Sequence, residues 1–386
     1  MHSHPGVLLT QTVRKVQYED AVESDRPLRS HPVRKAPLLK LARSLTAALA
    51  VSALALTAAC GGSSDSDATA ATADGKAPAL RLGYFANVTH ASAVYGVAHG
   101  DFQQALGATE LTTSVFNAGP AAIEALAGGA IDATFIGPNP AINGYANSGG
   151  RLLRIIAGTT YGGASLIVKP EITDVSQLTG RTIATPQLGN TQDVAAKAYF
   201  KEQGVTAEII NQENAQTLDL FTRGEIDGAW VPEPWASRLQ IDGGGKVLVD
   251  EASLWPEGKF VTTQLVVRQD FLAKNPGTVD DLLEGLIAAN DAASKKSPEV
   301  QKAVNDQIAE DTGKALSEDV LEAAFENLTP SLDPVASSLA KSAEDAAAVG
   351  VSKAAADLTG IYDLRQLNAL LQAAGRPEVG DSSLGI

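Results

Sequence analysis

Two stretches of the chain repeat one helix–turn–strand pattern, and this repeat limits the possible folds more than any other feature. Both EALAGGAIDATFIGPNPA (124–141) and DLFTRGEIDGAWVPEPWA (219–236) run helix, glycine turn, Ile-Asp, strand and Pro-x-Pro. Strands that alternate with helices are typical of α/β folds. The repeat therefore predicts two similar α/β lobes that present strand-end loops to a shared cleft. Chance similarity within a common helix–turn–strand unit is the alternative.

The alternation continues on both sides of the repeat. A parallel sheet is predicted from the first half, and 260–267 is predicted to return the chain to the first lobe. This assigns 79–162 plus 262–386 to lobe 1 and 163–261 to lobe 2. Beyond Asp270 nearly everything has amphipathic helical periodicity, which predicts helices packed around lobe 1. Strands are predicted at 79–85, 111–116, 131–136, 152–157, 165–168, 181–184, 207–211, 226–230, 246–249 and 260–267.

The segment IATPQLGNTQDV (183–194) is predicted to form a strand end, a tight loop and a helix start. Asn190 or Thr191 is the expected helix cap. Helix N-termini have unpaired N–H groups and a partial positive charge, so they bind anions well. The loop offers neutral donors and no Lys or Arg, which suits a sulfonate, carboxylate or nitrate. An ordinary capped turn is the alternative interpretation.

The first sixty residues have the layout of a secretory signal peptide. A basic segment (34–43) precedes a small apolar run (45–59), which is short for a membrane span, and then Cys60 and a Gly/Ser/Asp-rich stretch. LTAAC resembles a lipoprotein signal, although Thr57 stands where a large apolar residue is usual. We therefore predict a signal peptide over 1–59 with a possible start at Val33, a lipid on Cys60, and a flexible linker over 60–78. Plain secretion with a free Cys60 is the alternative.

Composition excludes several classes of function. The net charge of −15 argues against nucleic-acid binding, which needs a basic surface. A single Cys excludes a disulfide framework within the chain and a cysteine-based zinc site. Three of the five His precede residue 32, so no histidine metal cluster is expected in the folded part. The prediction is a protein without metal or cofactor.

Five segments in order resemble a known family. They are LRLGYF, GPAAIEALAGGAIDATFIGPNPAI, SQLTGRTIATPQLGNTQD, GEIDGAWVPEPWASRL and KFVTTQLVVRQDFLAKNP. Over roughly 79–300, this order resembles the solute-binding proteins of aliphatic sulfonate/nitrate/taurine ABC importers. The resemblance implies a periplasmic-binding-protein type II fold, with two α/β lobes joined by two crossover strands. It also implies a monomeric, extracytoplasmic binder that serves a separate permease and ATPase and performs no catalysis.

Carried onto this sequence, the resemblance places ligand-binding candidates in the strand-end loops of both lobes. They are Asn87, Thr89, His90, Gly119, Pro120, Gly137, Asn139, Pro140, Tyr161, Gly162, Gly163, Gln187, Gly189, Asn190, Thr191, Trp230, Glu233, Trp235, Thr262 and Thr263.

Some candidates have a second interpretation. His90 either donates to an oxyanion or caps a helix at the surface. Glu233 either holds the amine of a taurine-like zwitterion or caps its helix. Trp230 and Trp235 either grip an organic tail or belong to a core, with one of the two expected in the cleft. Because the loops lack Lys and Arg, an aliphatic sulfonate is the first choice of ligand, before nitrate, taurine or a pyrimidine precursor.

An enzyme and a sensory module are the alternative classes of function. An enzyme of related fold makes the thiamin pyrimidine, but that family uses a Cys-rich motif, and this chain has only Cys60. No nucleophile–base pair or Walker-type loop is present in the sequence. A sensory binding module with the same fold stays open.

Overall fold

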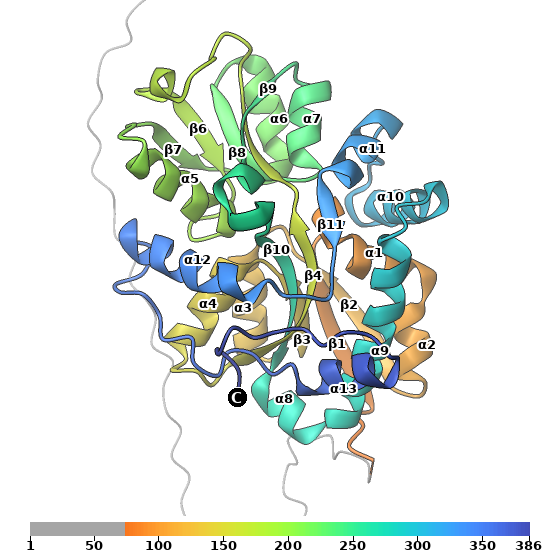
Figure 1. Cartoon of the computed structure of the whole chain (residues 1–386). Coiled ribbons are helices and arrows are strands. Elements are labelled where there is room, and N and C mark those ends of the chain that lie inside the picture. Colours follow the sequence, from red (N-terminus) through yellow and green to blue (C-terminus); the bar gives the residue numbers. More distant parts are fainter. Residues whose placement is uncertain (1–73) are drawn as a thin grey trace, which may run out of the picture. The chain divides into compact units, whose positions relative to one another are not determined.

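The computed structural model describes residues 74–386, which lie in one compact unit. The predicted signal peptide, the predicted start at Val33, the lipid site at Cys60 and most of the predicted linker fall outside the described residues. Among the described residues the strands form two sheets, and we call each sheet with its helices a lobe (Figure 1).

The sheet of lobe 1 has the strand order β11-β4-β10-β3-β1-β2. Strand β1 pairs in parallel with β2 and β3, as the alternating pattern predicts. Strand β10 is inserted antiparallel between β3 and β4, so the sheet is mixed and not parallel throughout. The bounds are β1 Ala79–Tyr84, β2 Glu110–Val115, β3 Ala133–Ile136, β4 Leu153–Gly162, β10 Val261–Arg268 and β11 Leu328–Pro330.

The sheet of lobe 2 has the order β7-β6-β8-β5-β9. Strands β6, β7 and β8 are parallel, whereas β5 is inserted antiparallel between β8 and β9. Each lobe thus receives one connecting strand in the reverse direction. The bounds are β5 Ala164–Val168, β6 Thr182–Thr185, β7 Glu208–Asn211, β8 Gly228–Pro232 and β9 Lys246–Asp250.

Helices cover both sheets (Figure 1). Residues 91–106 form two helices, α1 and α2, which are separated at Gly100 with a φ of 85°. The α-helices are α1 Ala91–His99, α2 Asp101–Leu106, α3 Gly119–Ala127, α4 Pro138–Asn147, α5 Thr191–Glu202, α6 Asn214–Arg223, α7 Trp235–Ile241, α8 Gln269–Lys274, α9 Pro276–Ala293, α10 Pro298–Thr312, α11 Glu318–Glu326, α12 Ala336–Ala348 and α13 Arg365–Ala373. Short 3₁₀ turns are η1 Val88–His90, η2 Val175–Leu178, η3 Glu251–Leu254 and η4 Pro256–Gly258.

The chain crosses between the sheets at two places. It leaves lobe 1 at Gly162 and Gly163, whose φ angles of 77° and 75° strain any residue with a Cβ. It returns at the start of β10, where the Thr262 hydroxyl donates to the carbonyl of Gly162. Side-chain and backbone hydrogen bonds therefore hold the two crossings together.

The C-terminal third differs from the prediction. It contains β11, which pairs antiparallel with β4, and irregular segments before and after α13. Its helices are not confined to lobe 1, since α12 packs against α5 and α11 packs against α7 of lobe 2. Helical periodicity alone cannot show which lobe a helix face meets, and this placement depends on long-range contacts.

The predicted linker extends too far along the chain. The backbone N–H of Ala77 donates to the Thr278 hydroxyl at 2.7 Å, and the Thr109 hydroxyl donates to the Ala77 carbonyl at 2.7 Å. The Lys76 ammonium lies 2.8 Å from a carboxylate oxygen of Asp281. Residues 76 and 77 are therefore part of the folded lobe.

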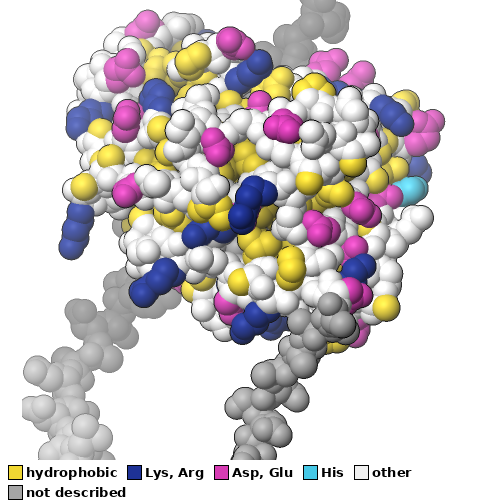
Figure 2. Space-filling model, turned by 60° about the horizontal axis from the view of Figure 1, so that its bottom comes forward, with side chains coloured by type: hydrophobic (Ala, Val, Ile, Leu, Met, Phe, Trp, Pro, Cys, Tyr) yellow, Lys and Arg dark blue, Asp and Glu magenta, His cyan; other side chains and the backbone are white. Residues whose placement is uncertain are grey.

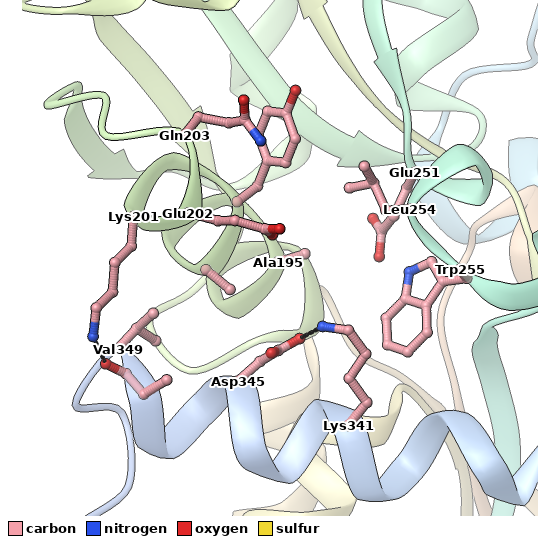
Figure 3. Close-up of a pocket in the computed structure, with 13 residues that line it drawn as sticks. Ala195, Lys201, Glu202, Gln203, Glu251, Leu254, Trp255, Lys341, Asp345 and Val349 are labelled. Carbon is pink, nitrogen blue, oxygen red and sulfur yellow. Dashed lines mark hydrogen bonds and ion pairs between the residues drawn. The ribbon is translucent and has the colours of Figure 1, made fainter.

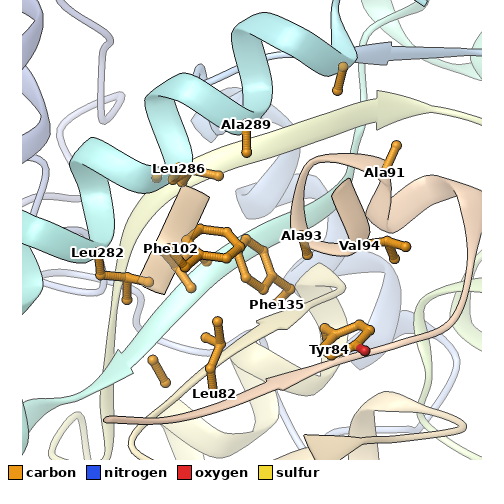
Figure 4. Close-up of a cluster of buried hydrophobic side chains, with 14 of the residues drawn as sticks. Leu82, Tyr84, Ala91, Ala93, Val94, Phe102, Phe135, Leu282, Leu286 and Ala289 are labelled. Carbon is orange, nitrogen blue, oxygen red and sulfur yellow. The ribbon is translucent and has the colours of Figure 1, made fainter. Parts of the chain in front are cut away.

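The main core of lobe 1 lies between β1, β3 and helices α1, α2 and α9 (Figure 4). Phe102 and Phe135 are fully buried, and their ring centroids lie 5.9 Å apart. Gly96 and Gly285 fit closely around Phe102, because a Cβ on either would come within 3.0 Å of it. This packing fixes α1, α2 and α9 on the face of the sheet.

The face shown in Figure 2 carries charged side chains of both signs. On the face shown in Figure 2, Lys and Arg are interspersed with Asp and Glu and form no continuous basic area. None of the described helices is both long and apolar enough to cross a bilayer.

We expect Phe102→Ala to lower the free energy of unfolding by about 3–5 kcal/mol, because it removes a fully buried ring from close packing. Urea unfolding followed by circular dichroism measures the change. Val115→Ala on strand β2 is the control, since Val115 is 42% exposed and we expect a change within about 0.5 kcal/mol. A loss below about 1 kcal/mol for Phe102→Ala would contradict this account of the core.

Candidate binding site between the lobes

A small cavity lies where loops of both lobes meet. Its volume is about 20 Å³, only slightly more than one water molecule needs. The two lobes are therefore close together at this point. Its lining consists of Phe85, Asn87, Thr89, His90, Asn117, Gly137, Asn190, Thr191, Gln192, Asn214, Pro232 and Thr262.

The lining residues come from the ends of strands, where α/β proteins place ligands. Lobe 1 contributes the loop after β1, Asn117 after β2, Gly137 after β3, and Thr262 on β10. Lobe 2 contributes the start of α5, Asn214 at the start of α6, and the end of β8. Seven of the predicted residues thus line one cavity: Asn87, Thr89, His90, Gly137, Asn190, Thr191 and Thr262.

The loop before α5 is shaped by the carboxylate of Asp193. Its oxygens accept from the Thr185 hydroxyl at 3.0 Å, the Gly189 N–H at 2.9 Å and the Asn211 amide at 3.0 Å. Lys197 completes the set with an ion pair at 2.7 Å. Asp193 is fully buried, and its charge is balanced within lobe 2 by Lys197. This network fixes the backbone that brings α5 to the cavity.

The cavity is electrostatically suited to an anion without carrying a formal positive charge. No Lys, Arg, Asp or Glu is among its lining residues. Gly137 and Asn190 are the N-caps of α4 and α5, and α6 begins at Asn214. The first N–H groups of a helix have no partner within the helix and create a positive potential. Three helices thus direct this potential at one small space.

His90 is a neutral donor in this site. Burial lowers the pKa of its imidazole from 6.5 to about 3. Its Nδ1 lies 3.3 Å from the backbone nitrogen of Phe85, whose N–H donates to it, and its ring stacks on the Phe85 ring with centroids 4.4 Å apart. With Nδ1 accepting, the proton of the neutral ring belongs on Nε2. The surface-cap alternative for His90 does not fit a residue that is 3% exposed.

Two buried polar atoms of the lining have no hydrogen-bond partner among the described residues. They are the Thr191 hydroxyl oxygen and the Asn214 amide oxygen, and both belong to lobe 2. A buried polar atom without a partner costs about 1–3 kcal/mol. A bound ligand with several oxygen atoms would give the Thr191 hydroxyl an acceptor, and the Asn214 amide offers it N–H donors after a flip.

Gly137 permits the close approach of the lobes. A Cβ at this position would lie 2.5 Å from the Thr191 hydroxyl oxygen and 3.5 Å from the Thr262 carbonyl oxygen. Gly137 belongs to lobe 1 and Thr191 to lobe 2. A side chain at residue 137 would therefore hold the lobes apart.

Three hydrogen bonds join the lobes beside the cavity. The Trp235 indole donates to the Asn87 side-chain oxygen at 3.0 Å. The Asn327 amide donates to the Glu233 carboxylate at 2.8 Å, and the Thr89 N–H donates to the Glu233 carbonyl at 3.4 Å. Glu233 also accepts from the N–H of Ser237 in the first turn of α7, which agrees with its capping alternative.

Several predicted residues lie outside the cavity lining. The Trp230 ring is fully buried in the core of lobe 2 against Tyr199 and Phe200, so the expectation that it grips a ligand tail is wrong. Asn139 donates to the Ser342 carbonyl, and Gly119 packs against Pro140. The remaining ones that do not line the cavity are Pro120, Pro140, Tyr161, Gly162, Gly163, Gln187, Gly189, Trp235, Glu233 and Thr263.

Five lining residues are absent from the predicted set of ligand-binding candidates: Phe85, Asn117, Gln192, Asn214 and Pro232. Phe85, Gln192 and Pro232 adjoin predicted site segments, and a wider window around each loop would have included them. Asn117 and Asn214 follow strands β2 and β7, which the same strand-end argument covers.

A family model described as the NMT1-like family matches residues 73–309. This match covers more than half of the chain. The chain belongs to the NMT1-like family.

This member of the NMT1-like family is also similar to named proteins. It is 29% identical over 177 residues to the taurine-binding periplasmic protein of Escherichia coli (strain K12), covering 45% of this chain and 54% of that one. The chain thus spans about half the length of this curated relative.

Two solved structures share the fold. The alkanesulfonate-binding protein of Xanthomonas axonopodis pv. citri bound to MOPS matches with a TM-score of 0.62 and 21% identity, over 73% of this chain and 97% of that one. The periplasmic nitrate-binding protein of Synechocystis PCC 6803 matches with a TM-score of 0.64 and 15% identity, over 78% of this chain and 90% of that one. These likenesses confirm the predicted fold, that of periplasmic binding proteins with two α/β lobes.

Within residues 74–386, no group of three or more His, Cys, Asp or Glu is arranged to hold a metal ion.

We expect the stability of the protein to fall below about pH 6.5 in part through His90. Its folded pKa of about 3 lies below the unfolded value of about 6.5, so the unfolded state takes up the proton first. The contribution is complete above about pH 6.5 and is lost as pH falls, by up to about 1.4 kcal/mol for each pH unit. Melting temperatures of the native protein and His90→Gln between pH 7.5 and 5 measure it. Equal pH slopes for the two proteins would contradict the buried neutral ring.

We expect Gly137→Ala to weaken ligand binding at least tenfold while the free energy of unfolding changes little, because the new methyl group meets Thr191 only when the lobes close. Isothermal titration calorimetry measures the affinity for the anion that the native protein binds most tightly. Gly380→Ala is the matched control, since a Cβ there meets nothing within 4 Å. Unchanged affinity in Gly137→Ala would show that the lobes do not approach in this way when ligand binds.

Proposed function

We propose that this chain is the extracytoplasmic solute-binding protein of an ABC importer and that it captures a small anion between its lobes. The observation that carries the proposal is the convergence of neutral donors from both lobes on one cavity. The relatives named above by role are binding proteins for taurine, alkanesulfonate and nitrate. A lipid on Cys60, a permease and an ATPase as partners, a monomeric state and the absence of catalysis belong to the same proposal.

A short aliphatic sulfonate is the ligand that we propose first. Its three oxygens match the helix N-termini and the unpartnered Thr191 and Asn214 side chains of lobe 2. Taurine fits less well, because its ammonium finds no carboxylate among the lining residues and the Glu233 carboxylate is engaged by Asn327 and Ser237.

Nitrate is the second candidate, and the size of the cavity favours it. With about 20 Å³ between the lobes, a planar three-oxygen ion requires less separation than a sulfonate with a carbon tail. Neither tryptophan of the predicted aromatic grip lines the cavity, which further favours compact ligands.

The proposed mechanism is closure of the lobes around the ligand. An open form admits the anion, whose contacts with both lobes favour the closed form. The hydrogen bonds from Trp235 to Asn87 and from Asn327 to Glu233 form only when the lobes meet, so they add to the stability of the closed form. Closure also surrounds the anion with dipoles in a site that excludes water.

A thermal-shift screen with ethanesulfonate, taurine, nitrate and a pyrimidine tests the proposal. We expect ethanesulfonate or nitrate to raise the melting temperature, since a ligand that binds only the folded state stabilises it. We expect Thr191→Val to weaken binding of the tightest of these ligands at least about tenfold, because the substitution removes a hydroxyl that donates to a charged group.

Thr222→Val is the matched control for that substitution, because the exposed Thr222 hydroxyl bonds only to the Leu218 carbonyl on α6. Binding of none of the four ligands would contradict the proposed function. Equal losses in both variants would contradict the proposed site.

A further inference from the structure

A second and larger hollow lies between the lobes, on the side of α12. Its volume is about 590 Å³, and it shares no lining residue with the anion cavity. We call it the α5–α12 groove. Helix α5 and turn η3 form its walls from lobe 2, and α12 forms its wall from lobe 1 (Figure 3). A volume of this size suits a small organic molecule.

Two carboxylates of lobe 2 point into the groove. Figure 3 shows Glu202 on α5 and Glu251 on η3 directed toward the space between them, with the Trp255 ring at one side. Tyr199 also lines the groove and packs edge-on against Trp230 beneath it. Carboxylates beside aromatic faces are the usual surroundings of a bound organic cation.

The lysines of the groove do not neutralise these two carboxylates. Lys341 pairs with Asp345 at 2.6 Å, and Lys201 donates to the Ala348 carbonyl at 2.5 Å. Glu202 has no ion pair with any described residue. Glu251 is only 1% exposed, yet the hydrogen bonds that its carboxylate accepts come from neutral side chains, the Trp230 indole at 2.7 Å and Trp255. The charged residues of the lining are thus two bases and three acids, Lys201, Lys341, Glu202, Glu251 and Asp345, so the groove carries one net negative charge when Glu251 is ionised.

The surroundings of Glu251 agree with this excess. Burial raises the pKa of its carboxyl to about 7, and the negative charges of Asp250 and Asp345 add to the effect. The only nearby cation lining the groove from α12 is Lys341, which is paired with Asp345. From α5, the groove receives Glu202 and Lys201, and Lys201 is held at the end of α12.

The groove already receives one ammonium group from the chain itself. The Lys341 ammonium of lobe 1 lies 5.1 Å from the centroid of the Trp255 ring of lobe 2. An ammonium over the face of an indole is attracted by the ring. The Trp255 ring therefore already attracts a cation within the groove.

We propose that the α5–α12 groove binds an organic cation, a primary ammonium with a short apolar or aromatic body. The ammonium lies between Glu202 and Glu251, and the body packs against Tyr199 and Trp255. Because Asp345 on α12 of lobe 1 also lines the groove, the bound cation faces carboxylates of both lobes and stabilises the closed form. This coupling to the anion cavity rests on the proposed function, whereas binding of the cation itself does not.

Isothermal titration calorimetry with 2-phenylethylammonium at pH 8 tests the site, with 3-phenylpropionate as the oppositely charged probe of similar shape. We expect the amine to bind without any anion present and the carboxylate not to bind. Glu251→Gln and Glu202→Gln each weaken binding of the amine at least about fivefold. The control Glu208→Gln, at an exposed position of β7, leaves the affinity unchanged. The Glu202 variant keeps the test decisive if Glu251→Gln fails to fold, since Glu202 is exposed.

A pH series gives a second readout. We expect the amine affinity to fall as pH drops through about 7, because protonation of Glu251 removes a charge that the ammonium needs. This dependence disappears in Glu251→Gln. Absence of amine binding, equal binding of 3-phenylpropionate, or unchanged binding in both Gln variants would overturn the proposal.

The dependence on the proposed function is tested separately with Thr191→Val, which alters only the anion cavity. We expect this variant to bind the amine as the native protein does. In the native protein, saturating amine raises the affinity for the tightest-binding anion, and the anion raises the affinity for the amine by the same factor. Binding of the amine without binding of any anion would support the proposed cation site in the groove and overturn only the proposed function. An anion affinity that the amine leaves unchanged would overturn the coupling between the two sites.

Discussion

The antiparallel pairing of β4 with β10 is the interaction on which both lobes depend. These two strands run side by side within the lobe 1 sheet, and each is continuous with one crossing to lobe 2. Gly162 and Gly163 turn the chain at one crossing, and the Thr262 hydroxyl ties the other to it. Because the crossings are joined, the strand ends of lobe 2 can meet only a small set of loops in lobe 1. The cavity and the α5–α12 groove are the two consequences.

The anion cavity relies on oriented dipoles where many anion sites use lysine or arginine. The buried carboxylate of Asp193 on α5 is paired with Lys197 and holds the preceding loop in place. His90 is kept neutral by burial, so it offers an N–H without adding charge. Neutral donors need little desolvation before the ligand arrives, and closure then excludes water around the anion. The groove on the other side has the opposite character, with carboxylates and aromatic rings.

Much of the cavity could be predicted, because its residues follow strand ends that the sequence pattern locates. His90, Asn190 and Thr191 belong to this group. Trp230 could not be assigned in the same way. It lies within β8, whose residues are buried on both faces, so the alternation that normally separates the two faces of a strand is missing. Only the packing of Tyr199 and Phe200 shows that its ring belongs to the core of lobe 2.

By itself the sequence determined the alternation of strands and helices, the two similar lobes and the helix starts that bring neutral donors to strand ends. These properties are local, since they depend on periodicity, glycine turns and capping residues within about ten positions. The tertiary structure alone decided that β10 enters between β3 and β4, that β11 joins the same sheet, and that α12 lies against α5. Such contacts join residues more than a hundred positions apart, and their partners are selected by shape and burial in the folded chain, which no local pattern encodes.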